Sequence, residues 1–455
     1  MPGLLLPRRR GASRRIAVAV LVAAASVGMS VIPGPVGLIR TAEATDATPL
    51  PAWQCTIPSA QDADARPATG LRIALARLLG EHAYLLMESM RAAARNEGEA
   101  AAVEASLDAN SDTLGKAVSS VYGADAGTAF RALWERHVVA ALDYARATAA
   151  GDAAGAKSAT DELEAFQTAF NEFLAKANPK LDAHAEEAAV QLHLEHVQHF
   201  AAGDFAAAYE SARRAYGHMF DLGDMLARAI ATQYPDRFPD VAVAFSPASE
   251  LRVYLDRLLG EHLILAAEAM RATIADAPDV AAARQALDAN AKDLRDAVAS
   301  VYGEKAGTAF GEVWTAHLVA YLDYVEAVRT GDQARIDTVR QTLEAYGKVF
   351  GDFMANANPK LTSEGVSELI SSHTASLVQM VDQYRAENYP AAYATASEAY
   401  VHMFDVGDAL AGAIAAQFPD RYADVAELPR TDTGPAPDHA PMGAPSRANG
   451  WWRAR

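Results

Sequence analysis

Apolar residues recur every three or four positions through most of the chain between residues 71 and 424. Leu163, Phe166 and Phe170, for example, fall on one face of a helix that has 3.6 residues per turn. No stretch of similar length alternates apolar and polar residues as a half-buried strand does. The pattern predicts an all-α chain, whose first half has helices near 71–95, 99–122, 125–150, 153–176, 183–202 and 205–233.

Residues that end helices separate these segments. In Gly151-Asp152, the glycine can close one helix and the aspartate can cap the next. Asn178-Pro179 ends the fourth predicted helix, because proline disfavours helical geometry in the residue before it. Long amphipathic helices with such short connections predict an antiparallel bundle.

The helical region consists of two similar copies. One copy begins at Leu71 and the other at Leu251, which is 180 residues later. The offset is 184 between His218 and His402, so the second copy is four residues longer. We predict two homologous antiparallel bundles in tandem, with about six helices each, at 71–238 and 251–424 and with a linker at 239–250.

The flanks of the two copies differ from them in composition. Five arginines precede an apolar run from Ile16 to Ile32, and small residues spaced for cleavage follow at Ala42 and Ala44. This pattern predicts a signal peptide at 1–44, with export by either the general or the twin-arginine route. The protein is then secreted or works at the extracytoplasmic cell surface. We expect a linker at 45–70 and a disordered, proline-rich tail at 425–455.

Charge and cysteine content exclude several classes of partner and site. The net charge is −18, which argues against nucleic acid as a partner because that partner needs a basic face. Cys55 is the single cysteine, so an intrachain disulfide and a cysteine-rich metal site are both excluded. No further apolar run is long enough for a transmembrane segment in the mature chain.

The histidines offer the most informative chemistry. Of the 12 histidines, eight pair between the copies, and each lies on a different predicted helix of its copy. Apolar residues lie one turn before and after six of these eight, so we expect those six imidazoles to point into the cores. Facing helices of a bundle are where metal and cofactor sites are built. The pairs are His82 with His262, His137 with His317, His193 with His373, and His218 with His402.

The last pair carries aspartates on the same helix face. His218, Asp221 and Asp224 stand three residues apart, and His402, Asp405 and Asp408 repeat that spacing. Imidazole suits copper, zinc, iron and nickel, and methionines close to the histidines favour copper(I) or an axial haem pair. We predict a transition-metal site, with copper first, built from His82, His137, His193, His218, Asp221, Asp224, His262, His317, His373, His402, Asp405 and Asp408.

Two alternatives stay open for these residues. One is a haem-binding bundle that uses two facing histidines. The other is a structural or interaction module in which the histidines serve only the core. The chain has no Walker loop, no His-Glu-x-x-His motif and no Gly-x-Ser-x-Gly elbow, so we expect a protein without catalysis of its own.

Four short runs are Leu78-Leu79-Gly80-Glu81-His82, Ser120-Val121-Tyr122-Gly123, Ala177-Asn178-Pro179 and His218-Met219-Phe220. They resemble an uncharacterised class of exported helical proteins of Gram-positive bacteria, some of which carry a "copper amine oxidase" label. The resemblance spans about 71 to 424 and implies no established activity. Copper amine oxidases make their quinone from a tyrosine in an Asn-Tyr-Asp/Glu context, whereas this chain has Asn388-Tyr389-Pro390, so we reject that activity.

Overall fold

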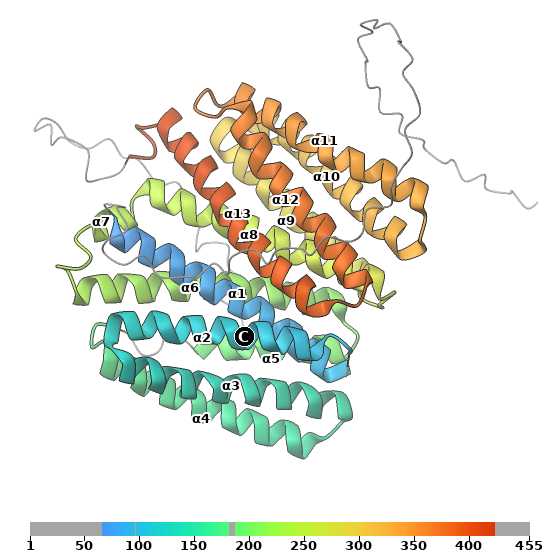
Figure 1. Ribbon diagram of the computed structural model, residues 1–455. Helices are drawn as coiled ribbons and strands as arrows, with labels where there is room; N and C mark the ends of the chain where they lie inside the picture. Colours follow the sequence, from blue (N-terminus) through green and yellow to red (C-terminus); the bar gives the residue numbers. More distant parts are fainter. Residues whose placement is uncertain (1–65, 96, 182–186, 424–455) are drawn as a thin grey trace, which may run out of the picture. The chain divides into compact units, whose positions relative to one another are not determined.

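The computed structural model describes residues 66–95, 97–181 and 187–423, which lie in one compact unit, Cys55–Arg455. They form 13 helices and no strand, which confirms the all-α fold class. The first six helices, here the N-terminal set, are α1 (Pro67–Arg95), α2 (Ala100–Tyr122), α3 (Ala124–Ala150), α4 (Ala153–Ala177), α5 (Glu187–Ala201) and α6 (Phe205–Gln233). The last six, the C-terminal set, are α8 (Pro247–Ile274), α9 (Val280–Tyr302), α10 (Glu304–Thr330), α11 (Gln333–Ala357), α12 (Ser363–Arg385) and α13 (Tyr389–Gln417) (Figure 1).

The helix boundaries follow the residues that end helices in the sequence. Gly151 adopts a left-handed conformation, with φ 68° and ψ 19°, and closes α3. The side chain of Asp152 then accepts hydrogen bonds from the backbone of Ala154 and Gly155 and so caps α4. The two sets match in helix length to within one residue, except that α5 has 15 residues and α12 has 23. That exception lies between Asn178 and His218, the stretch in which the offset to the corresponding residue of the second half changes from 180 to 184.

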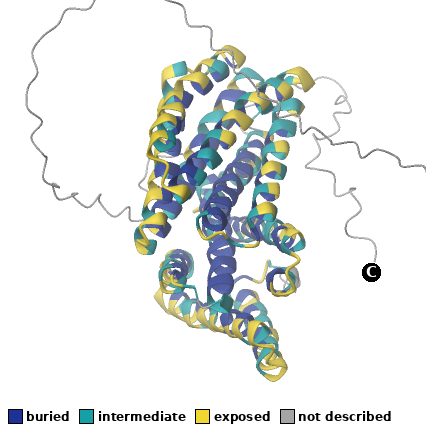
Figure 2. Cartoon of the chain, turned by 90° about the vertical axis from the view of Figure 1, so that its right-hand side faces the viewer, coloured by how far each residue is buried: buried dark blue, intermediate teal, exposed yellow. Residues whose placement is uncertain are grey.

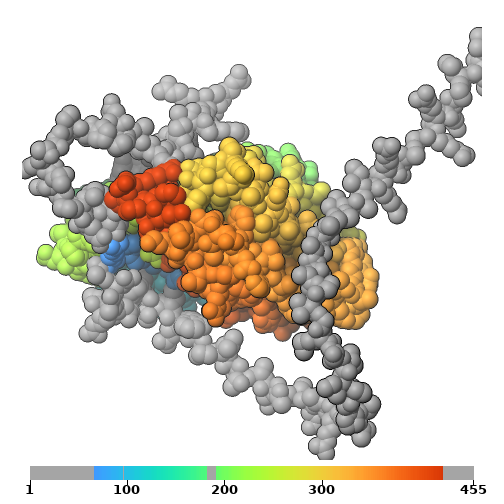
Figure 3. Space-filling model, turned by 90° about the horizontal axis from the view of Figure 1, so that it is seen from above, coloured from blue at the N-terminus to red at the C-terminus, as the bar shows by residue number. Residues whose placement is uncertain are grey.

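Two helices are buried along nearly their whole length, α1 in the N-terminal set and α8 in the C-terminal set. Figure 2 shows buried residues gathered in central helices and exposed residues on the outer ones. Seen from above, the surface over the C-terminal set is formed largely by α11 and α12 (Figure 3). Helices surround α1 and α8 on several sides, so a side chain at the middle of either helix is removed from water.

The two sets contact each other through matching helices: α1 with α8, α6 with α9, and α13 with α2. The hydroxyls of Tyr216 and Tyr400 share a hydrogen bond of 3.0 Å. Each hydroxyl also lies over a glycine of the opposite set. A Cβ atom on Gly80 would stand 2.5 Å from the Tyr400 hydroxyl, and one on Gly260 would stand 2.5 Å from that of Tyr216.

Several segments predicted from the sequence fall partly or wholly outside the described residues. The predicted signal peptide (1–44) and tail (425–455) lie outside them entirely. Within the predicted linkers, α1 already begins at Pro67, and a short helix, α7 (Val241–Ala244), connects the two sets. In the described part of the chain, no helix combines the length and the apolar character that crossing a bilayer requires.

Candidate metal centre

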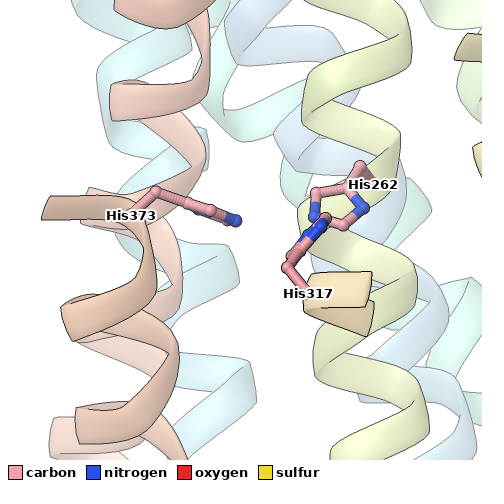
Figure 4. A group of neighbouring side chains, drawn as sticks. All are labelled: His262, His317 and His373. Atoms are coloured by element: carbon pink, nitrogen blue, oxygen red, sulfur yellow. The ribbon is translucent and has the colours of Figure 1, made fainter. Parts of the chain in front are cut away.

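Three histidines from three helices meet at the centre of the C-terminal set (Figure 4). His262 comes from the middle of α8, His317 from α10 and His373 from α12. Each is at most 1% exposed, which confirms that these imidazoles point into the core. We refer to them as the triad.

The triad has the geometry of a loosely preformed metal site. Each residue offers one ring nitrogen, and the three atoms all lie within 4.8 Å of one another. Metal–nitrogen bonds of about 2.0–2.1 Å place neighbouring ligand atoms roughly 3.3–3.6 Å apart, so binding draws the rings closer by about 1 Å. His373 points across the gap toward the other two rings, so a small movement of that side chain closes the site (Figure 4).

The triad nitrogens have unmet bonding capacity. Both ring nitrogens of His262, His317 and His373 are buried, and no protein group forms a hydrogen bond with them. A buried polar group without a partner destabilises a fold by about 1–3 kcal/mol. Three such side chains side by side therefore need a reason beyond packing, and a shared ligand supplies one.

Burial keeps the triad in the form that binds metals. It lowers the pKa of His317 to about 4, although the nearby backbone of Trp314 acts in the opposite direction. Burial, followed by repulsion from His317 and His402, lowers the pKa of His373 to about 3. The pKa of His262 falls well below its usual range, through burial and the other two rings. All three imidazoles are therefore neutral at pH 7 and have a lone pair available for a metal ion.

Aromatic side chains enclose the triad. The ring centre of Trp314 lies 4.9 Å from that of His262 and 4.5 Å from that of His317. Tyr346 stacks on His317, with ring centres 5.0 Å apart and planes 27° apart. These rings fix the imidazole orientations and exclude water, and no carboxylate belongs to the group.

The N-terminal set also buries its three paired histidines, His82 on α1, His137 on α3 and His193 on α5. A fourth, His196 on α5, is buried too, and its Nδ1 atom shares a hydrogen bond of 2.9 Å with the carbonyl of Ala208. The Nε2 atoms of His82 and His137 share a hydrogen bond of 3.1 Å. Burial lowers the pKa of His137 to about 3, with His193 acting in the same direction, and lowers that of His82 well below its usual range. Within residues 66–95, 97–181 and 187–423, however, only the triad brings three candidate ligands within 4.8 Å.

No protein-family model, curated protein or solved structure matches this chain. Assignment of the site therefore depends on the geometry and chemistry of its own residues.

The predicted aspartate stripe of the N-terminal set lies apart from the buried histidines. Asp224 accepts hydrogen bonds of 2.6 and 2.5 Å from the Nε and Nη2 atoms of the buried Arg72. His218 is partly exposed, and burial lowers its pKa while Asp221 acts in the opposite direction. The structure does not bring His218, Asp221 and Asp224 together as three ligands.

The stripe of the C-terminal set has the same arrangement. Asp408 pairs with Arg252, and Nε2 of His402 shares a hydrogen bond of 2.9 Å with the carbonyl of Leu369. Nδ1 of His402 lies 3.8 Å from Asp405. Each stripe thus links its helix to a neighbouring helix. The last aspartate of each stripe, Asp224 or Asp408, forms an ion pair with an arginine.

Met219, the residue next to His218, is not among the site residues predicted from the sequence. Met219 lines one cavity together with His82, His137 and His193, whereas His218 does not. Neighbours on a helix diverge by about 100°, so only one of the two can face the core. The available signal was the apolar face of α6, where Met219 and Leu222 lie three residues apart and are both buried.

Proposed function

We propose that this protein binds a transition-metal ion through His262, His317 and His373. The observation that carries the proposal is the convergence of three buried, neutral imidazoles from three helices, with all six ring nitrogens lacking a protein partner. Rigid helices supply the ligands, so the site is largely preformed before an ion arrives.

Copper in its monovalent state is the ion that fits this ligand set best. Three neutral nitrogens leave the full charge of the ion uncompensated inside a shell formed by Trp314 and Tyr346. The energy of burying an ion rises with the square of its charge, so a monocation is far less costly here than a dication. Imidazole also suits copper well.

The two alternatives from the sequence have less support. Pockets that enclose drug-sized ligands measure about 300–1,000 Å³. The ring centres of Trp314 and Tyr346 lie 4.5–5.0 Å from those of His262 and His317, so aromatic side chains already fill the space that a porphyrin would need around the triad. A purely structural role leaves unexplained why the fold retains buried ring nitrogens with no hydrogen-bond partner.

Three further features complete the proposal. Duplication of one ancestral bundle is supported by the matched helix lengths and by equivalent contacts, such as Asn110 with the Leu78 carbonyl and Asn290 with the Leu258 carbonyl. The arginine-rich, apolar start of the sequence supports export to the extracytoplasmic space. The closed aromatic shell of the triad supports a binding role without catalysis.

Titration of the purified protein with copper(I) under anaerobic conditions, against a chromogenic competitor, tests the triad. The variants His317→Leu and His373→Leu should each lose one tightly bound equivalent per chain. The control variant His218→Ala changes a partly exposed histidine of the N-terminal set that belongs neither to the triad nor to the lining of the cavity at His82, and it should retain that equivalent. Unchanged copper uptake in both triad variants, with circular dichroism showing that they are folded, would refute the proposal. A parallel titration with zinc(II) tests the preference for a monocation.

A further inference from the structure

A small cavity adjoins the histidine pair of the N-terminal set. Its volume is ≈ 40 Å³, and its lining includes His82, His137, Gln167 and Met219. A water molecule occupies only about 10–15 Å³ on this measure, so the cavity has room for an ion and one small ligand. Protein cores contain few empty spaces of this size, and the mostly apolar lining of this one includes three histidines and a glutamine.

The two imidazoles at the cavity are already set at the spacing of a shared ion. Their Nε2 atoms lie 3.1 Å apart, close to the roughly 3.3–3.6 Å expected for two nitrogens on one metal. When an ion binds between the two Nε2 atoms, the proton of the shared hydrogen bond moves to the Nδ1 atom of its own ring, so both imidazoles stay neutral and both Nε2 lone pairs face the ion. The Nδ1 atoms of both rings are buried without a protein partner, so the pair is not a closed hydrogen-bond network.

Two further side chains at the cavity point to a ligand. The thioether of Met219 is a soft donor, and thioether with imidazole selects copper(I) among biological metals. The Nε2 atom of Gln167 is buried and has no hydrogen-bond partner, although an amide nitrogen can donate two hydrogen bonds. Gly347 stands at the position of the C-terminal set that corresponds to Gln167, so only the N-terminal set has this amide donor at its histidines.

The side chains at the cavity differ between the sets at two corresponding positions. Ala141 lies one turn after His137, whereas the fully buried Tyr321 lies one turn after His317. The Tyr321 hydroxyl donates to the carbonyl of Ala266, so its ring fills the space beside α8. In the N-terminal set, Leu86 takes the place of Ala266 and does not fill the equivalent space.

We infer that the N-terminal set holds a second, different metal site, in which His82, His137 and the Met219 thioether bind one copper(I) ion and the cavity accepts one small neutral ligand. This site shares no residue with the triad. The two proposals can therefore fail independently.

Copper(I) titration in the His317→Leu background isolates this second site. There, Met219→Leu, which conserves side-chain volume, should weaken copper(I) binding at least about tenfold, as loss of a ligand outweighs the 10–100-fold effect of losing a supporting group. Met403→Leu, the matched change in the C-terminal set, should leave the affinity unchanged. X-ray absorption should show sulfur bound to copper only while Met219 is present. Equal affinity and an unchanged sulfur signal in Met219→Leu would overturn the assignment.

Carbon monoxide is the probe for the open position, because it binds copper(I) and gives an infrared band. The double variant Leu86→Ala/Ala141→Tyr places at the cavity the two side chains that the C-terminal set has there, those of Ala266 and Tyr321. It should retain copper(I) and bind carbon monoxide at least about tenfold more weakly than the parent. Equal carbon monoxide binding by the two proteins would show that the cavity is not the ligand position. A well-dispersed proton spectrum confirms that the double variant is folded.

Discussion

The two histidine centres occupy matching helices and yet differ in chemistry. In the C-terminal set three rings converge, with all their nitrogens unbonded by protein, inside a shell that Tyr321 and Tyr346 help to fill. In the N-terminal set two rings share a hydrogen bond beside a cavity, and Ala141 and Phe166 stand where those tyrosines are. The same histidine pattern therefore has different surroundings in the two sets, set by residues one turn away, such as Ala141 and Tyr321, and by residues on a neighbouring helix, such as Phe166 and Tyr346.

The largest expected effect on stability comes from removing the Tyr321 ring, which fills the space beside the triad in the C-terminal set. Tyr321→Ala should lower the free energy of unfolding by about 3–5 kcal/mol, because truncating a buried aromatic ring leaves a cavity. Urea denaturation measures the change. Tyr321→Phe is the control and should cost only about 1 kcal/mol, since it loses the bond to the Ala266 carbonyl but keeps the ring. A cost under 1 kcal/mol for Tyr321→Ala would mean that the contrast between the centres is not one of packing.

Metal binding should stabilise the two centres separately. At a free copper(I) concentration one hundred times the dissociation constant, one occupied site adds about 2.7 kcal/mol to the free energy of unfolding. His373→Leu should abolish the increment from the triad, and Met219→Leu should leave that increment in place. Thermal unfolding with and without copper(I) measures both. If Met219→Leu also abolishes the increment that belongs to the triad, the two centres are not independent.

A buried carboxyl found only in the C-terminal set provides a pH test. Asp256 is 1% exposed and neither of its oxygens has a hydrogen-bond partner, whereas Ala76 stands 180 residues earlier. Burial raises the pKa of Asp256 well above its usual range, and repulsion from Asp408 and Asp405 adds to this rise, although Arg252 opposes it.

The folded state therefore binds a proton that the unfolded state has released, and stability falls as the pH rises above about 4. Asp256→Ala should raise the free energy of unfolding by about 2 kcal/mol at pH 8 and by less near pH 4. Urea denaturation across this pH range checks the slope. An equal gain at both pH values would mean that Asp256 does not titrate as described.

The smallest effect is expected where the two sets share one bond. Tyr216→Phe and Tyr400→Phe should each cost about 1 kcal/mol, because each removes the same hydrogen bond between the hydroxyls. The double variant should cost little more than either single one, and a double-mutant cycle in urea measures this coupling. Additive costs would show that the hydroxyls have other partners.

The sequence was enough to predict the helices and the burial of six histidines. Helix ends were encoded locally, as at Gly151-Asp152, and the facing of His262 or His317 followed from apolar residues one turn away. It was not enough to choose the ligands. Whether His373 reaches His262 depends on the positions of α12 and α8, which are set by packing across the whole bundle.

The aspartate stripe illustrates the same limit. Asp224 and Asp408 were expected to face the histidines, but each pairs with an arginine more than 150 residues away in sequence, Arg72 or Arg252. A carboxylate near a core binds the closest cation, and only the tertiary structure determines which cation that is.

The tyrosines at the junction have a consequence for how the chain unfolds and changes. Each tyrosine hydroxyl lies against a glycine of the other set, so neither half has a complete surface alone. We expect calorimetry to show one cooperative transition for both sets. A side chain larger than glycine at position 80 would collide with Tyr400 of the other set as well as with Phe220 of its own, and one at position 260 would collide with Tyr216 and Tyr400. Substitutions at this junction in one half are therefore tolerated only together with matching substitutions in the other half.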